Sequence, residues 1–227
     1  MNKYLIANKA LFLLPPHTRE NFINYARNPY SSYEEDKKVI FVHIPKAAGK
    51  YVSKALLGAP NGTGHNRITY YMRDEKRFKS YFKFTFVRNP WDRLVSAFFY
   101  IKNFNPKSND RIFFDYYIGQ NTTFESFICK LADDNFWKLI RKWEHFTPQY
   151  EFICDGSGDV RVDFLGRYES LRLDIKKIAK KIGVNISIKN PINTSKHAPY
   201  NHYYSEETRK IVGHRYTKDI SLLGYDC

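Results

Sequence analysis

Cysteine is scarce in this chain of 227 residues, which has only Cys129, Cys154 and Cys227. An odd number of cysteines at wide, irregular spacing supports neither a disulfide framework nor a zinc site. We therefore expect the protein to reside in a reducing compartment and to hold no metal ion.

Long apolar runs are also missing. The most apolar stretch near the N-terminus, residues 4–14, is interrupted by Asn8 and Lys9 and ends at Pro15 and Pro16. This stretch is too short to span a bilayer, and no small-residue cleavage site follows it. We therefore expect no membrane span and no secretory signal, which together with the cysteine content predicts a cytoplasmic protein.

Acidic residues are outnumbered, with 23 Asp and Glu against 37 Lys and Arg, a formal net charge of +14. Such a surface attracts anions, and nucleic acid, acidic polysaccharide, a nucleotide and an anionic membrane all qualify. A nucleic-acid-binding module is therefore an alternative function. Only the charge and the aromatic content support it, because the sequence contains no zinc-finger, RRM or helix-turn-helix pattern. The aromatic residues, 17% of the chain, suit stacking on sugar rings as well as core packing.

The length and the 43% hydrophobic content favour one substantial domain. No internal repeat or low-complexity block is present, and the clearest shift in composition is the polar stretch 28–38. We interpret residues 1–37 as an N-terminal helical arm and linker, and residues 38–227 as the main domain.

Two apolar runs, 39–44 and 82–87, are typical of strands buried on both faces, and a helix signal follows each, at 51–57 and 90–101. A third strand is predicted at 160–165. Helices are predicted through 171–182 and over 205–223, ended by Gly183 and Gly224. This order predicts an α/β fold: three layers, with a central, mainly parallel sheet of about four or five strands flanked by helices, and a P-loop-like nucleotide site.

The segment IPKAAGK, residues 44–50, forms a small glycine-containing loop between the first strand and its helix. Backbone N–H groups converge there on one point that binds anions, and Lys46 adds a positive charge. A triphosphate P-loop would need glycine in place of Ile44, and serine or threonine in place of Tyr51 to hold magnesium. The missing magnesium ligand favours transfer of a less charged group that needs no metal; a solvated turn is the alternative interpretation.

A second anion site is predicted within residues 84–100. Arg88 stands at the strand end and Ser96 two turns into the following helix, where both can reach one phosphate. Arg93 could instead pair with Asp92 or another neighbour. A nucleotide with a separate 3′-phosphate needs such a second site, whereas ATP does not.

The two motifs in this order, IPKAAGK and then VRNPWDRLVSAFFY (87–100), resemble the 5′-phosphosulfate loop and the 3′-phosphate motif of carbohydrate sulfotransferases. The group concerned contains the chondroitin, dermatan and HNK-1 enzymes and many bacterial homologues. The resemblance continues through HFTPQ (145–149), VDFLGRYESL (162–171) and NTSKHAPYNHYYSEET (193–208), and covers roughly residues 39–225.

The resemblance implies a donor, 3′-phosphoadenosine-5′-phosphosulfate, used without a metal, and a carbohydrate acceptor such as a polysaccharide or glycolipid. The implied contacts to the 5′-phosphosulfate are Lys46, Ala47, Ala48, Gly49, Lys50 and Tyr51. Arg88 and Ser96 would hold the 3′-phosphate, and Ser195 and Lys196, beside His197, would belong to a flap over the ligands. The usual family loop reads PKTAGTS, so Ala47, Lys50 and Tyr51 depart from it.

A histidine suits the removal of the acceptor hydroxyl proton near neutral pH. His65 is the first candidate, since its place between the motifs resembles that of the base in related uronosyl sulfotransferases. His145 is the second candidate and also suits a packed core. Glu169 is a third, or else forms an ion pair with Arg167 or orients the nucleotide, while His43 precedes the loop on a buried strand and is interpreted as structural.

The predicted reaction is therefore direct in-line transfer, with His65 as base and with Lys46 stabilising charge on the leaving phosphate. A basic stretch near His65 fits either an acidic glycan or a solvated helix face; it comprises Arg67, Arg73, Lys76, Arg77 and Lys79. A nucleotide kinase is the alternative enzyme. The acceptor sugar and the oligomeric state are not encoded in these motifs.

Overall fold

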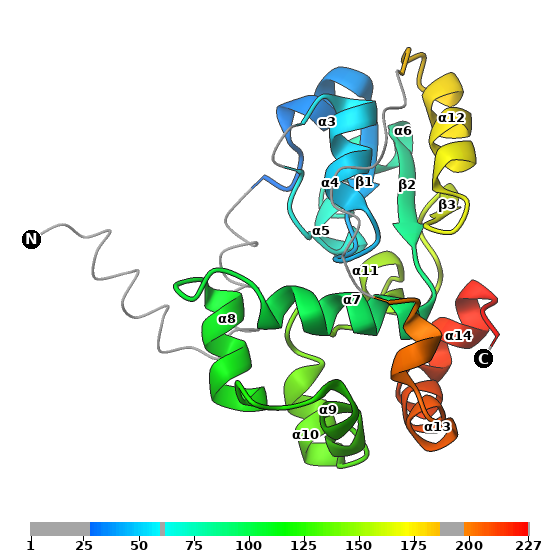
Figure 1. Cartoon of the computed structure of the whole chain (residues 1–227). Helices are drawn as coiled ribbons and strands as arrows, with labels where there is room; N and C mark the ends of the chain where they lie inside the picture. Colours follow the sequence, from blue (N-terminus) through cyan, green and yellow to red (C-terminus); the bar gives the residue numbers. More distant parts are fainter. Residues whose placement is uncertain (1–27, 60–61, 187–197, 227) are drawn as a thin grey trace, which may run out of the picture.

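The computed structural model describes residues 28–59, 62–186 and 198–226. Its centre is a parallel sheet in the order β1 (Val39–Val42), β2 (Phe82–Val87) and β3 (Phe164–Arg167) (Figure 1). All four residues of β1 are buried, as expected for a strand covered on both faces. The first two predicted strands and the parallel pairing are confirmed.

Two details of the sheet differ from the prediction. The described residues form three strands rather than four or five, and the third begins at Phe164 rather than at position 160. Val160 instead makes an isolated antiparallel bridge with Cys154. Pairing with β2 starts at Asp163, whose N–H donates to the Lys83 carbonyl and whose side chain accepts from the Lys83 N–H. Val160 lies in the turn that begins at Cys154, so it is not part of the sheet.

Helices cover both faces of the sheet, which gives the predicted three layers (Figure 1). One face is buried by α4 (Gly49–Val52), the π-helical turn η1 (Ser53–Leu57) and α12 (Leu171–Lys181). The other face is buried by a second set of helices: α5 (Ile68–Tyr71), α6 (Glu75–Ser80), α11 (Tyr150–Ile153) and α14 (Thr217–Leu223).

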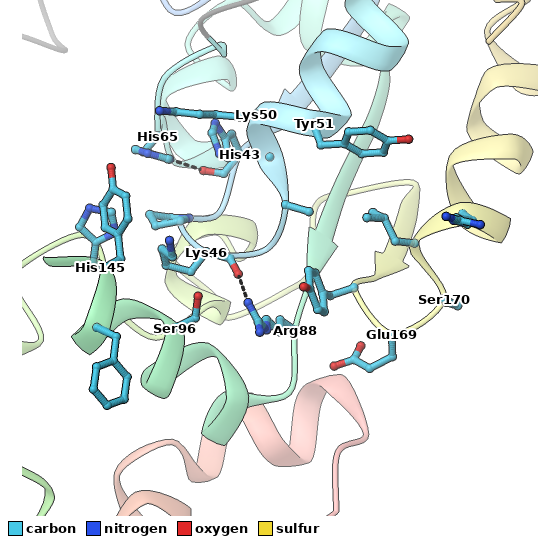
Figure 2. A pocket seen from close by; sticks show the side chains of 18 of the residues that line it. His43, Lys46, Lys50, Tyr51, His65, Arg88, Ser96, His145, Glu169 and Ser170 are labelled. Atoms are coloured by element: carbon cyan, nitrogen blue, oxygen red, sulfur yellow. Dashed lines mark hydrogen bonds between the residues drawn. The ribbon is translucent and has the colours of Figure 1, made fainter. Parts of the chain in front are cut away.

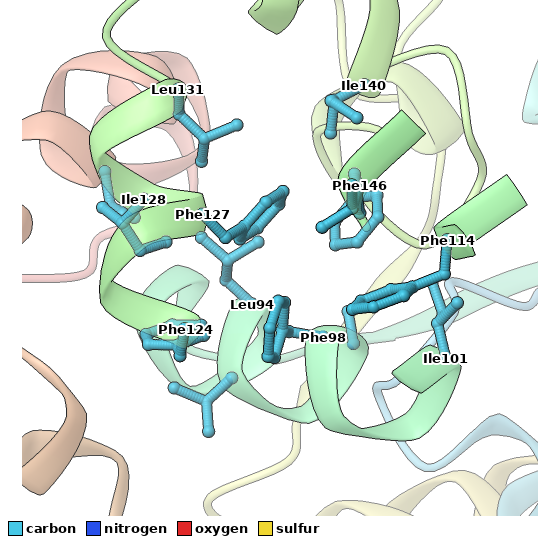
Figure 3. Packing of buried hydrophobic residues seen from close by; sticks show 14 of the residues in the cluster. Leu94, Phe98, Ile101, Phe114, Phe124, Phe127, Ile128, Leu131, Ile140 and Phe146 are labelled. Carbon is cyan, nitrogen blue, oxygen red and sulfur yellow. The ribbon is translucent and has the colours of Figure 1, made fainter. Parts of the chain in front are cut away.

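A separate aromatic cluster lies beside the sheet, around α7 (Pro90–Lys102) (Figure 3). Asn89 caps α7 by accepting from two backbone N–H groups, and proline occupies its first position, as predicted. The helices packed against α7 are α8 (Asn109–Phe113), η2 (Phe114–Ile118), α9 (Phe124–Lys130), α10 (Asp134–Ile140) and α13 (Glu206–Arg215). This cluster fixes α7, which carries much of the second anion motif.

The stretch 28–38, interpreted as a linker, contains helix α3 (Ser32–Lys37). Ser31 and Glu34 form a capping box, and Glu34 is fully buried with its Oε1 accepting from the Phe41 N–H at 3.0 Å. The helix is thereby attached to β1. Residues 1–27 of the predicted arm lie outside the described residues.

The C-terminal helix predicted over 205–223 is in fact two helices, because the backbone at Tyr216 leaves helical geometry between α13 and α14. Tyr216 is buried, and its hydroxyl donates to the Phe146 carbonyl at 2.8 Å. A short 3₁₀ turn, η3 (Tyr200–Tyr203), precedes α13. Across the described ranges no helix combines the length and apolar character needed to cross a membrane.

Candidate functional site

A cavity of about 1030 Å³ opens at the carboxyl ends of the strands (Figure 2). Side chains from both anion motifs line it, together with three histidines and the start of α12. Of the predicted site residues, those lining the cavity are Lys46, Ala48, Gly49, Lys50, Tyr51, His65, Arg88, Ser96 and His145. The structure therefore brings together segments separated by about a hundred residues of chain.

Ala47 is the exception within the loop. It is 1% exposed and packs with the apolar residues beneath the loop rather than in the cavity. Any ligand contact through Ala47 is therefore limited to its backbone. Ser195 and Lys196 lie outside the described residues.

The anion-binding loop has unusual backbone geometry. Lys46 and Ala48 adopt left-handed conformations, with φ of 68° and 65°, which cost a non-glycine residue about 1–2 kcal/mol each. Two arginines of the second motif hold the loop: Arg93 Nε donates to the Pro45 carbonyl at 2.9 Å, and Arg88 Nη1 to the Lys46 carbonyl at 3.2 Å. The two anion motifs are thus joined directly.

Gly49 is required by a steric contact. A Cβ atom at this position would lie 1.7 Å from Cδ2 of His43, far inside contact distance. Helix α4 therefore begins against the His43 ring, and only glycine permits this approach. The structural role predicted for His43 agrees with its 6% exposure.

The side chain of Lys46 points into the cavity, with Nζ 3.7 Å from the centroid of the Tyr100 ring. Burial, together with the nearby charges of Arg88 and Lys50, lowers the pKa of Lys46 to about 7. The face of the Tyr100 ring stabilises the ammonium form of Lys46, but much less than a bound anion would. An arriving phosphate or sulfate would complete its charge balance.

Arg88 is 4% exposed, and its guanidinium pairs with the Asp92 carboxylate through Nε (2.7 Å) and Nη2 (2.8 Å). Its Cζ lies 4.0 Å from the centroid of the Tyr168 ring. Asp92 therefore pairs with Arg88, four residues earlier; of the partners considered for Arg93, this excludes Asp92, and Arg93 instead donates to the Pro45 carbonyl. Ser96 and Arg88 line the same cavity, as predicted for a shared phosphate site. The ion pair between Arg88 and Asp92 was not predicted from the sequence.

His65 has one ring nitrogen committed. Its Nδ1 donates to the His43 carbonyl at 2.9 Å, which leaves the Nε2 lone pair able to accept a proton. Nε2 lies 3.7 Å from Glu144 Oε1, and the side chain is 24% exposed. Burial lowers the pKa of His65 below its ordinary value, so the neutral, basic form prevails near neutral pH.

His145 is placed less favourably for catalysis. Its Nε2 faces Asp110 Oδ2 at 3.4 Å, and its Nδ1 is buried with no hydrogen-bond partner in the described structure. The side chain is 6% exposed, and burial lowers its pKa. Both candidate histidines line the cavity, but the free nitrogen of His145 is inaccessible, so the geometry favours His65.

Glu169 has structural partners. Its Oε1 accepts from the Asn89 N–H at 2.7 Å and its Oε2 from the Tyr225 hydroxyl at 3.1 Å. Arg167 does not pair with it as proposed from the sequence, but contacts the Leu223 carbonyl and the Tyr225 ring instead. Glu169 thus links the second motif to the C-terminus, which disfavours it as the base.

Carboxylates neutralise much of the basic stretch. Arg67 pairs with Glu151 at 3.1 Å. Arg77 pairs with Glu35 at 2.7 Å. Lys79 pairs with Glu75 at 2.5 Å. An acidic glycan bound there would compete with these carboxylates.

Several residues around the cavity escaped the sequence analysis, notably Tyr100, Asp110 and Gln149. They contact Lys46, His145 and Arg88 across long stretches of chain. Gln149 closes the HFTPQ segment, which was noted only as part of a resemblance. Within the described parts of the chain, no group of His, Cys, Asp or Glu side chains is placed to hold a metal ion.

The three-layer fold, with two anion motifs on one cavity at the strand ends, is typical of α/β proteins that bind phosphorylated ligands. The model of the sulfotransferase family matches residues 31–226. The chain belongs to this family, and the resemblance in its motifs is confirmed.

Among curated relatives, carbohydrate sulfotransferase 14 of Danio rerio is 27% identical over 84% of this chain and 60% of its own length. Carbohydrate sulfotransferase 11 of Rattus norvegicus is 27% identical over 70% of this chain and 54% of its own. An uncharacterized protein of Archaeoglobus fulgidus is 33% identical over 53% of this chain and 83% of its own. The chain thus spans a little over half the length of the two carbohydrate sulfotransferases. No solved structure matches it significantly.

Proposed function

We propose that this protein transfers a sulfuryl group from 3′-phosphoadenosine-5′-phosphosulfate to a hydroxyl of a carbohydrate acceptor. The observation that carries the proposal is the convergence of the Lys46 loop, the Arg88 and Ser96 pair, and His65 on one cavity. Membership of the sulfotransferase family and the names of the two carbohydrate-sulfotransferase relatives support both the reaction and the acceptor class.

The residues present fit the donor. In α4 the hydrogen bonds of the helix start with the N–H groups of Tyr51 and Val52, which donate to the Ala48 carbonyl. Gly49 and Lys50 precede them and line the cavity with Lys46, where helix-opening N–H groups suit an anion. The His43 ring occupies the space that a side chain at position 49 would need, so glycine lets α4 begin beside His43 at the edge of the cavity. Arg88 and Ser96 supply a second polar site for the 3′-phosphate.

In the proposed step, the acceptor oxygen attacks sulfur as the bond from sulfur to the 5′-phosphate oxygen breaks. The hydroxyl proton passes to His65 Nε2, whose opposite nitrogen is held by the His43 carbonyl. Lys46 and the loop amides stabilise the negative charge that develops on the leaving phosphate. The products are the sulfated acceptor and adenosine 3′,5′-bisphosphate.

Titration calorimetry with adenosine 3′,5′-bisphosphate in a chelating buffer tests donor recognition. Micromolar binding without metal, weakened in Lys46→Ala and Arg88→Ala proteins, supports the proposal. A preference for magnesium-ATP would point to a kinase. Tighter binding to DNA or RNA, falling steeply with salt, would point to a nucleic-acid-binding module.

A further inference from the structure

The side-chain amide of Gln149 binds both backbone polar groups of Arg88. Its Oε1 accepts from the Arg88 N–H at 2.9 Å, and its Nε2 donates to the Arg88 carbonyl at 2.8 Å. Arg88 follows directly after β2, where its own N–H and carbonyl leave the strand ladder. The amide of Gln149 therefore replaces a neighbouring strand for this one residue.

Gln149 is itself held by the C-terminal part of the chain. Asp219, on α14, accepts from the Gln149 N–H and the Tyr150 N–H, each at 2.8 Å. Gln149 and Asp219 are both fully buried. Water cannot replace these contacts, so a change of either residue leaves polar groups without partners.

The contacts continue from Arg88 into the anion-binding loop. The Arg88 guanidinium donates to the Lys46 carbonyl, so the series runs from Asp219 through Gln149 and Arg88 to Lys46. These contacts bring together residues 42 to 70 positions apart in the sequence. A shift of the Arg88 backbone would move its guanidinium and disturb the loop carbonyl together.

We infer that Gln149, anchored by Asp219, is a positioning residue that sets Arg88 for binding the 3′-phosphate of the nucleotide. The inference rests on the proposed function. It assigns Gln149 no contact with substrate; its effect passes through the backbone of Arg88.

Two variants of Gln149 separate positioning from general stability. Gln149→Met keeps the length of the side chain but removes both hydrogen bonds to the Arg88 backbone. The Arg88 backbone should then shift, and we expect the affinity for adenosine 3′,5′-bisphosphate to fall about tenfold. Gln149→Glu keeps the acceptor but loses the donor while ionised. When protonated, its carboxyl group can again donate to the Arg88 carbonyl.

Burial and the neighbouring Asp219 should raise the pKa of a glutamate at 149, against the opposing positive charges of Arg88, which it contacts, and of Arg93, which also lowers the pKa of Asp219. We therefore compare the affinity of Gln149→Glu with that of wild type at the same pH. As the pH falls from 8 to 6 and the new carboxyl group takes up a proton, the ratio of the two affinities should rise toward one. The ratio cancels the titration of the ligand. Gln120→Glu is the matched control, because Gln120 is exposed and its side-chain amide donates to Asp115, and its ratio should stay flat.

Calorimetry well below each melting temperature provides the measurement. If both Gln149 variants bind the bisphosphate like wild type, or if the Gln149→Glu ratio does not change with pH, the inference is wrong. If Gln149→Met does not fold, the pH dependence of Gln149→Glu decides alone. Failure of the wild type to bind the bisphosphate would instead overturn the proposed function.

Discussion

Binding of adenosine 3′,5′-bisphosphate should drive proton uptake by Lys46. In the free protein, burial together with the charges of Arg88 and Lys50 lowers the pKa of Lys46 to about 7. A phosphate beside Nζ favours the ammonium form and raises this pKa again. Lys46 should therefore be largely neutral above pH 7 before binding and charged afterwards.

The magnitude follows from the titration curve. With a free pKa of about 7, Lys46 is about one-half neutral at pH 7 and about nine-tenths neutral at pH 8. Binding at pH 8 should thus take up about 0.9 proton, and affinity should fall by up to about tenfold for each pH unit above 7. The phosphate groups themselves titrate near pH 6 and contribute little at pH 8.

Calorimetry in buffers of different ionisation enthalpy measures the proton uptake. Lys46→Arg keeps a positive charge that does not titrate, so its uptake at pH 8 should be near zero. Lys50→Ala, which changes an exposed lysine on the same loop, should retain most of the uptake. Tight wild-type binding at pH 8 with no proton uptake would refute the reasoning.

Three further outcomes are expected. Gly49→Ala should lower the free energy of unfolding by about 1–3 kcal/mol in urea titrations, because its Cβ would overlap the His43 ring; unchanged stability would contradict the close approach of these two residues. His65→Ala should slow transfer about 10²–10⁴-fold in a product assay while leaving bisphosphate affinity nearly unchanged, and full activity would exclude His65 as base. Burial raises the pKa of Asp219 from 3.8 to about 6, so the folded state binds this proton more tightly and its contribution to stability should be lost as pH rises from about 4 through 6. Asp219→Asn should flatten that slope, and an unchanged slope would exclude Asp219 as its source.

The sequence was most informative where the pattern is local. The apolar runs that became β1 and β2, and the Asn89 cap with Pro90 at the start of α7, depend on neighbouring residues alone. The anion loop could also be located, because strand, small residues and helix follow one another directly. These features bring Lys46 and Arg88 to the same edge of the sheet.

The parts that were missed depend on distant contacts. The Cys154–Val160 bridge is a local exception, because the segment DGSGD between them (155–159) is a turn signal that the predicted strand from 160 did not take into account. Gln149 meets Arg88 across 61 positions, and Asp219 meets Gln149 across 70. The pairing of Arg88 with Asp92 could have been predicted, because residues four apart on a helix face each other. Arg88 lies just before the helix, which is why this spacing was not applied to it.

The most direct test of the central claim is a transfer assay with 3′-phosphoadenosine-5′-phosphosulfate, a chelator and a panel of neutral and acidic glycans, read by mass spectrometry. The account predicts equal amounts of adenosine 3′,5′-bisphosphate and a sulfated glycan, with both lost in Arg88→Ala and His65→Ala proteins. A wild-type protein that binds the bisphosphate yet sulfates no glycan in the panel would contradict the carbohydrate assignment.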